Sequence, residues 1–121
     1  MSVPKIFESE FKFCQILWEN EPISSVELSK LCKEQLGWAK TTTYTVIKRL
    51  RDRGVVNSEN TIVTSLITKE QAQQAEVGEL IDRAFSGSLP EFVVAFAKNC
   101  NLNEEQIKAL YDMIDADKEG L

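Results

Sequence analysis

A short stretch near the middle of the chain, WAKTTTYTVIKRLRDRG at residues 38–54, gathers hydroxyl, phenol and cationic side chains. Val46, Ile47 and Leu50 recur at helical spacing and predict one apolar face of an amphipathic helix, with the polar side chains mostly off that face. Exposed hydroxyls and cations can hydrogen-bond base edges and phosphates in a DNA major groove. The candidate DNA-binding residues are Lys40, Thr41, Thr42, Tyr44, Thr45, Lys48, Arg49, Arg51 and Arg53.

The cations and the hydroxyls of this candidate set are expected to have different tasks. Lysine and arginine supply phosphate contacts, which make affinity sensitive to salt. The threonines and Tyr44 face base edges, and a threonine methyl group suits contact with thymine. Two alternatives stay open. The stretch can be an ordinary surface helix whose basic end complements the helix dipole, or some cations, especially Arg49, can pair with carboxylates inside the fold.

Two helices are expected to precede this stretch and to support it. The first runs over residues 9–19 and is capped by Ser9. The second begins with a capping box of Ser24 and Glu27, and a short turn then leads to the third helix near Lys40. Two short helices joined by a turn, the second with a polar and basic face, predict a helix-turn-helix.

Residues rich in β-branched side chains follow the third helix and predict a hairpin. Val55-Val56 and residues 61–67 are the strand candidates, and the cluster NSEN at residues 57–60 is the expected turn. Three helices and a hairpin make the winged-helix arrangement, so residues 1–67 are expected to be a winged-helix DNA-binding domain. The turn carries no Lys or Arg, so the wing is expected to bind the phosphates of the DNA backbone weakly.

Residues 68–121 are expected to form a helical dimerisation domain, so the fold class is mainly α with a small β-hairpin. Periodicity predicts helices over residues 68–85, 88–99 and from 103 onward, with caps of Thr68 with Gln71, Ser88 with Glu91 and Asn103 with Gln106. Three short helices bury too little apolar surface alone, so a homodimer is expected, with folding back onto the N-terminal domain as the alternative. The candidate dimerisation residues are Leu80, Ile81, Phe85, Phe92, Val93, Phe96, Ile107, Leu110, Tyr111 and Ile114.

The composition is that of a globular chain with an uneven distribution of charge. Of its 121 residues, 43% are hydrophobic and 27% are charged, and the net charge is −5. Residues 1–67 carry 9 basic and 8 acidic side chains, whereas residues 68–121 carry 5 and 11, so the acidic excess lies in the second part. No apolar run approaches the roughly 20 residues of a membrane span, and the N-terminus lacks a signal-peptide core, so a cytoplasmic protein is expected.

The residue types argue against catalysis and metal binding. The chain has no histidine, which removes the usual zinc sites, the Ser/His and Cys/His nucleophile pairs and the commonest general base. Cys14, Cys32 and Cys100 show no CxxC spacing, and the first two fall among apolar helix positions, so buried free thiols are expected there. We therefore expect no enzyme, no cofactor and no metal site.

Three segments of the chain share their order and several residues with a known family. They are ESEFKFCQILWENEPISSVELSK, GWAKTTTYTVIKRLRDRGVV and FSGSLPEFVVAFAKNCNLNEEQIKALYDMI, and together they span about residues 9–115. They resemble the penicillinase-repressor family (BlaI/MecI/CopY-like), which typically shows a Trp before the recognition helix, the pattern T-x-x-T-L-(I/L)-x-R-L-x-x-(K/R)-G and a G-S-L segment. These patterns fall here on Thr42, Thr45, Val46, Ile47, Arg49, Leu50, Arg53 and Gly54, and on Gly87-Ser88-Leu89.

The resemblance implies a dimeric winged-helix transcriptional repressor without a small-molecule cofactor. Such proteins bind double-stranded dyad operators built on TACA/TGTA half-sites, often upstream of β-lactamase and sensor genes, and so act in antibiotic resistance. A membrane sensor-protease that detects β-lactam leads to cleavage of the repressor within its dimerisation helices, typically at an Asn-Phe bond. The matching positions here are Ala95 and Phe96, so the residue before the bond differs.

Two further features depart from the family pattern, and two other functions stay open. Tyr44 stands where many members carry a basic residue, so base preference is expected to differ. The tail DADKEGL lacks the cysteine cluster of copper-responsive members, so no metal sensing is expected. A winged helix that has lost DNA binding would be a protein-interaction module. A pocket between the domains would instead make an effector-binding regulator of another regulon.

Overall fold

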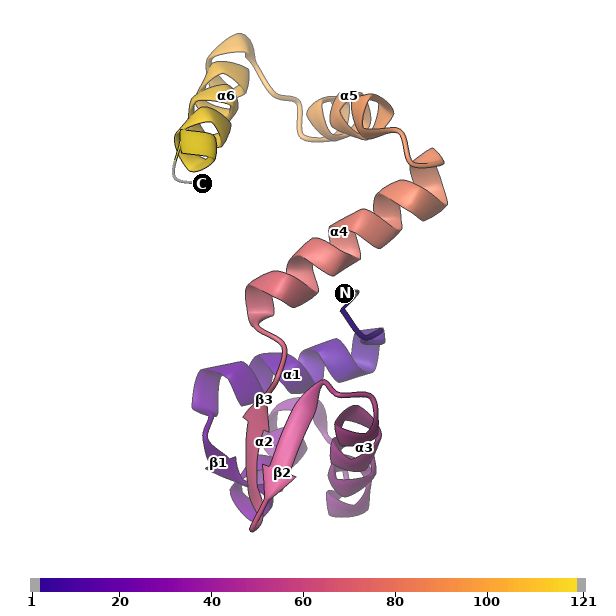
Figure 1. The fold of residues 1–121 in the computed structure, drawn as a ribbon, viewed down its shortest axis with the longest axis vertical. Coiled ribbons are helices and arrows are strands. Elements are labelled where there is room, and N and C mark those ends of the chain that lie inside the picture. Colours follow the sequence, from indigo (N-terminus) through magenta and orange to yellow (C-terminus); the bar gives the residue numbers. More distant parts are fainter. Residues whose placement is uncertain (1–2, 120–121) are drawn as a thin grey trace. The chain divides into compact units, whose positions relative to one another are not determined.

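The computed structural model describes residues 3–119, which are mainly helical with a small antiparallel sheet (Figure 1). The predicted fold class is confirmed. Contacts divide the chain into an N-terminal unit, Met1–Val77, and a C-terminal unit, Gly78–Leu121, while the predicted domain division after residue 67 stays a prediction. The elements in order are α1 (Glu8–Asn20), β1 (Ile23–Ser24), α2 (Ser25–Leu36), α3 (Lys40–Asp52), β2 (Val56–Glu59), β3 (Ile62–Ser65), α4 (Lys69–Phe85), α5 (Leu89–Asn99) and α6 (Glu104–Glu119).

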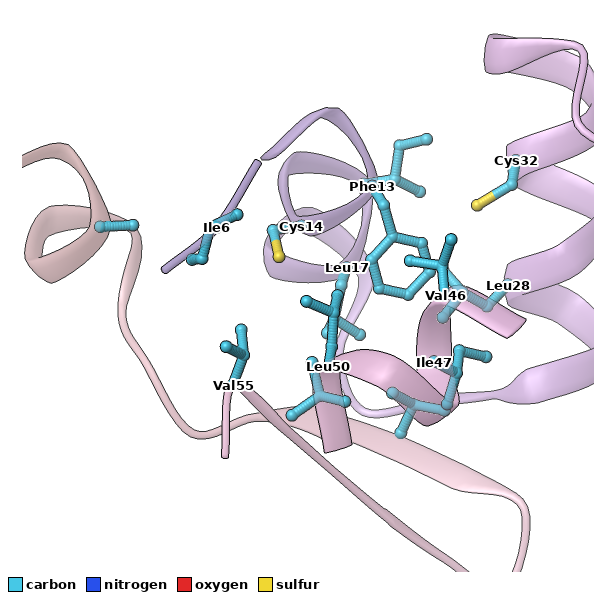
Figure 2. Packing of buried hydrophobic residues seen from close by; sticks show 14 residues of the cluster. Ile6, Phe13, Cys14, Leu17, Leu28, Cys32, Val46, Ile47, Leu50 and Val55 are labelled. Carbon is cyan, nitrogen blue, oxygen red and sulfur yellow. The ribbon is translucent and has the colours of Figure 1, made fainter. Parts of the chain in front are cut away.

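The core of the N-terminal unit is shared by α1, α2, α3 and the sheet (Figure 2). Phe13 of α1, Leu28 of α2 and Leu50 of α3 are fully buried. The ring of Phe13 also lies nearly parallel to that of Trp38, with their centroids 6.2 Å apart. Because each of the three helices carries one apolar stripe, the stripes pack together and leave the opposite faces to solvent.

The wing is a hairpin of β2 and β3, and β1 pairs with the other edge of β3. Its two-residue turn is Asn60-Thr61, with φ angles of 51° and 66°, the left-handed region that type I′ hairpin turns require. The predicted turn over residues 57–60 is wrong for its first three residues, which pair with β3, because cross-strand pairing outweighs local turn preference. The sequence did not predict β1, since two residues show no periodicity.

Side-chain caps explain where two helices of the N-terminal unit begin. Ser24 caps α2 as predicted, and its hydroxyl accepts the backbone N–H of Glu27 at 3.1 Å. The prediction that Ser9 caps α1 is wrong. Phe7 occupies the N-cap position, and the Glu10 carboxylate accepts its backbone N–H at 3.0 Å. The Glu10 side chain thus supplies one half of a capping box, while no N-cap side chain accepts a hydrogen bond from the first turn of α1.

The C-terminal unit contains the end of α4 with α5 and α6, and its side chains pack sparsely. Phe85 and Phe92 meet edge to face with ring centroids 5.6 Å apart, and Phe92 lies 6.3 Å from Phe96. Among residues 78–117, no side chain is buried. The apolar side chains of these helices therefore stay partly or fully exposed, unlike those in the core of the N-terminal unit.

Candidate nucleic-acid interface

The polar face of α3 is exposed along the whole helix. Thr43, Val46 and Leu50 are buried in the core, at intervals of three and four residues. The helical period places the other side chains away from the core, with hydroxyls in the first turns and cations mainly in the last. The exposed residues of the predicted set are Lys40, Thr41, Thr42, Thr45, Lys48, Arg49 and Arg51.

A shallow hollow lies on this face of α3. Its volume is about 210 Å³, and it is lined by Thr41, Thr42, Thr45, Val46 and Arg49. The Thr45 hydroxyl donates to the Thr41 carbonyl at 2.9 Å, so its proton is committed to the helix backbone while its oxygen can still accept. Methyl groups, hydroxyl oxygens and a guanidinium in one hollow match the methyl, donor and acceptor groups on the major-groove edge of base pairs.

Tyr44 lies at the border between the buried and the exposed face of α3. Its ring is half-buried and packs against the core cluster, while the Lys40 ammonium lies 5.6 Å from the ring centroid. A cation over an aromatic face is attracted by the electron density of the ring. The contact orders Lys40 at the start of α3, a helix whose N-cap residue, Ala39, provides no side-chain hydrogen bond.

Arg53 differs from the other cations of the predicted set because it is bound inside the N-terminal unit. One guanidinium nitrogen donates to the Lys5 carbonyl at 2.7 Å, and another forms an ion pair with Glu10, whose side chain is almost fully buried. The guanidinium carbon also lies 5.4 Å from the ring centroid of Phe7. The internal pairing considered mainly for Arg49 therefore occurs at Arg53, and the phosphate contact of Arg53 stays a prediction.

Sequence reasoning missed the role of Glu10, although the sequence contains a signal for it. Glu10 lies three and four residues before Phe13 and Cys14, on the buried face of α1. A carboxylate in that position needs a cationic partner, because burying an unpaired charge is costly. The pair joins the start of α1 to the end of α3 and so helps to hold these two helices together.

The chain matches the family model of the penicillinase repressor over residues 6–116. It belongs to the penicillinase repressor family. It is similar to the penicillinase repressor of Bacillus licheniformis, with 23% identity over 120 residues that cover 96% of this chain and 94% of that protein. It is also similar to the penicillinase repressor of Staphylococcus aureus, with 24% identity over 115 residues that cover 92% and 91%.

A solved structure supports the winged-helix fold of this family member. The solution structure of the DNA-binding domain of the repressor BlaI matches with a TM-score of 0.53 and 22% identity, covering 59% of this chain and 93% of that chain. Members of the penicillinase repressor family are DNA-binding transcriptional repressors and not enzymes. The predicted family and the prediction that the chain is no enzyme are confirmed.

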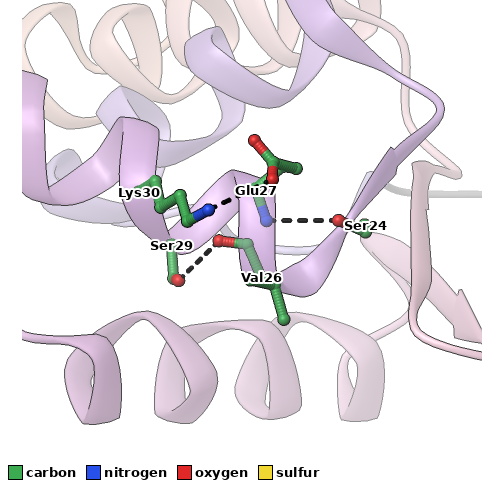
Figure 3. A network of polar contacts seen from close by, with 5 residues as sticks. All are labelled: Ser24, Val26, Glu27, Ser29 and Lys30. Atoms are coloured by element: carbon green, nitrogen blue, oxygen red, sulfur yellow. Dashed lines mark hydrogen bonds and ion pairs between the residues drawn. The ribbon is translucent and has the colours of Figure 1, made fainter.

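The wing carries no cationic side chain with which to bind phosphates. Glu59 is exposed at the end of β2, and residues 55–67 contain no Lys or Arg. At the start of α2, the ammonium of Lys30 lies 3.4 Å from the Glu27 carboxylate, and the Ser29 hydroxyl donates to the Val26 carbonyl at 2.8 Å (Figure 3). Helix α2 exposes Lys30 and Lys33, whereas α3 exposes four cations, so more of the positive charge of the helix-turn-helix lies on α3.

Two of the cysteines, Cys14 and Cys32, are buried in the N-terminal unit. Burial, together with the Glu10 carboxylate, raises the pKa of the Cys14 thiol to about 12, although Arg53 acts in the opposite direction. Burial also raises the pKa of Cys32, although the Thr43 hydroxyl acts to lower it. Both are free thiols, as predicted, and they stay protonated at neutral pH. Cys100 is exposed.

The predicted dimerisation residues lie on the sparsely packed helices of the C-terminal unit. Ile81, Phe85, Phe92 and Leu110 are half-buried, whereas Leu80, Val93, Phe96, Ile107, Tyr111 and Ile114 are exposed. The predicted cleavage residues Ala95 and Phe96 lie within regular helix α5.

Among residues 3–119, no cluster of three or more potential ligands could hold a metal ion, and no helix combines the length and the hydropathy that a membrane span needs.

Proposed function

We propose that this chain is a homodimeric repressor that binds a dyad operator and controls β-lactam-resistance or related genes. One observation carries the DNA-binding part of this proposal. The exposed face of α3 combines hydroxyls and cations around a hollow of about 210 Å³, while its opposite face is locked into the core. A helix with one face in the core and a polar face outside is the recognition element of a helix-turn-helix.

The proposed DNA contacts divide by chemistry. Lys40, Lys48, Arg49 and Arg51 bind phosphates, and the threonines with Tyr44 meet base edges. Tyr44 can offer only its exposed edge, since the rest of its ring packs on the core. Arg53 supports the interface chiefly by holding the end of α3 through Glu10.

The exposed apolar side chains of the C-terminal unit support a second copy of the chain as its partner. Tyr111 and Ile114 of α6 are 64% and 57% exposed, and Val93 of α5 is 50% exposed. Helix α5 also carries an apolar hollow of about 400 Å³, whose lining includes Val94 and Ala95. A twofold dimer buries the same patch on both copies and presents two recognition helices to a dyad.

We also propose that proteolysis of the dimerisation region releases the operator, with a membrane sensor-protease as the partner. Cleavage between Ala95 and Phe96 would detach Phe96 from Phe92, its ring neighbour at 6.3 Å, and separate α6 from the rest of the chain. Loss of the dimer lowers the effective concentration of the second recognition helix at its half-site. A chain truncated after Ala95 that still dimerised and held the operator would contradict this switch.

A mobility-shift experiment tests the DNA-binding proposal. A duplex with a TACA/TGTA dyad is compared with a scrambled duplex at about 50 and 200 mM salt. A protein making 6–10 phosphate contacts should bind the dyad about 10³–10⁵-fold more weakly at the higher salt. Lys48→Ala should reduce the salt dependence, whereas Lys108→Ala, which removes a cation from α6, should not.

A negative result has a definite meaning. No specific shift from a folded and dimeric protein would contradict the TACA/TGTA operator. Selection from random duplexes would then separate two cases. Enrichment of another dyad would indicate a changed base preference, whereas no enrichment would indicate a protein-interaction module, in keeping with the uncharged turn of the wing and its exposed Glu59.

A further inference from the structure

Helix α4 connects the two units, and their boundary falls within it. The helix runs without interruption from Lys69 to Phe85, while the division between the units lies after Val77. The first residue beyond the division is Gly78. Glycine is a poor residue for the interior of a helix, because it loses more conformational freedom on folding than any other residue.

The beginning of α4 is tied to the N-terminal unit. The indole N–H of Trp18 donates to the Ile67 carbonyl at 2.9 Å, and Ala72, in the first turn of α4, is only 2% exposed. Thr68 and Gln71 form the predicted capping box, with reciprocal bonds of 2.9 and 3.0 Å. The direction in which α4 leaves the N-terminal unit is therefore set by contacts before residue 73.

A second set of bonds holds the strand that leads into α4. The Glu21 carboxylate accepts the backbone N–H of Ser65 at 2.8 Å and the hydroxyl of the same residue at 2.7 Å. Together with Trp18, Glu21 anchors the end of the wing to α1. After Ala72, residues 73–78 are all exposed, so no described residue of the N-terminal unit buries this part of α4.

Neither space nor backbone geometry within the chain requires glycine at position 78. A Cβ placed on Gly78 would meet no heavy atom within 4 Å. Its φ is not positive, unlike that of Gly37, Gly54 and Gly87, which each follow the end of a helix. Relative to alanine, glycine in a helix lowers the local helix-coil equilibrium roughly two- to five-fold. Gly78 therefore lowers the helix stability of α4 at the boundary of the two units, where the helix can bend more easily.

We propose that Gly78 determines which separations between operator half-sites the dimer accepts. The inference rests on the proposed dimer and dyad. Each base pair added between half-sites moves one of them by about 3.4 Å and turns it by about 35°. A stiff connection favours one spacing, whereas a helix that bends at Gly78 lets each recognition helix follow its half-site. Gly78 is thus a specificity-determining residue that touches no base.

The experiment compares Gly78→Ala with the wild-type protein on a series of dyad duplexes whose half-site separation changes by one base pair. The variant should bind the best spacing at least as well as the wild type. Its affinity should fall at least several-fold more steeply one base pair away. Amide hydrogen exchange near residue 78 should slow about two- to five-fold, the expected gain in helix stability.

Two further variants control for composition and position. Glu76→Ala changes an exposed residue of the same helix and should leave the spacing profile unchanged. A75G combined with G78A moves the glycine one turn back and should restore a broad profile. An unchanged profile in Gly78→Ala, in a protein that still dimerises, would overturn the inference.

The main competing explanation is that Gly78 allows a close approach between helices of the two copies. In that case Gly78→Ala would weaken the dimer itself, which sedimentation measures without DNA, and this result would overturn the proposed role in spacing. Failure of the proposed function would be seen in the wild-type protein alone. There, the wild-type protein would show no preference for any dyad over scrambled DNA, before any variant is compared.

Discussion

The two units of this chain treat apolar side chains in opposite ways. In the N-terminal unit, Phe13 and Leu50 are fully buried by residues of the same unit. In the C-terminal unit, Tyr111 and Ile114 are 64% and 57% exposed although they form the apolar stripe of α6. Amphipathic periodicity is present in both units, but only the first has enough elements crossing one another to close a core.

The same sequence pattern can therefore indicate either a core or an interface. A stripe is buried by its own unit when a sheet and two other helices surround it, as around α3. Where helices follow one another with short connections and little else, as in α5 and α6, the stripe stays open to another molecule. The proposed homodimer is the simplest way to cover it.

Replacing buried and exposed apolar residues should give the largest contrast. Leu50→Ala should lower the free energy of unfolding by about 2–5 kcal/mol, because it leaves a cavity in the core. Tyr111→Ala should change unfolding of the N-terminal unit by less than about 0.5 kcal/mol. Tryptophan fluorescence during urea unfolding can measure this unit alone, because Trp18 and Trp38 both lie in it. Equal losses would break the contrast between the units.

A charge placed on the exposed stripe of α6 tests its role as an interface. Ile114→Asp should weaken self-association by about 30-fold or more, corresponding to at least about 2 kcal/mol, because a buried interface cannot accept an unpaired carboxylate. Ala109→Asp puts the same carboxylate on the opposite face of α6 and serves as the control. Analytical ultracentrifugation gives both dissociation constants. Similar constants for the two variants would show that the stripe is not the dimer surface.

Tyr44 tests whether the recognition helix uses a half-buried residue for specificity. Tyr44→Ala should reduce discrimination between operator and scrambled DNA by about 1–3 kcal/mol. Tyr44→Phe keeps the ring that packs on the core and removes only the phenol, so it separates base contact from support of α3. Competition binding measures the discrimination. If neither variant changes it, Tyr44 reads no base.

The pH dependence of stability should report the buried thiol of Cys14. Its folded pKa of about 12 lies above the ordinary value of 9.0, so its contribution is fully present below pH 9 and is lost as pH rises toward 12. The loss attributable to Cys14 should be on the order of 1 kcal/mol between pH 8 and pH 10. Urea unfolding of the wild type and of Cys14→Ala at both pH values isolates it. An equal pH dependence in the two proteins would refute this assignment.

Local signals predicted much of the fold because they involve residues close in sequence. The caps at Ser24, at Thr68 with Gln71 and at Asn103 with Gln106 each join residues three apart, and all occur in the structure. The cap predicted at Ser9 is wrong because α1 already begins at Glu8, and the Glu10 carboxylate accepts the backbone N–H of the N-cap residue Phe7. The difference lies in tertiary contact, since Glu10 is held in place by Arg53 from another helix.

Sequence patterns were sufficient to predict the fold class, the polar face of α3, the caps of α2 and α4 and the resemblance to a repressor family. These features follow from helical period and short-range hydrogen bonds, which need no knowledge of the rest of the chain. Contacts between distant parts of the chain were needed to show that Arg53 rather than Arg49 pairs inside the fold, that β1 completes the sheet and that residues 57–59 belong to a strand. Each of those outcomes depends on partners from elements that periodicity cannot bring together.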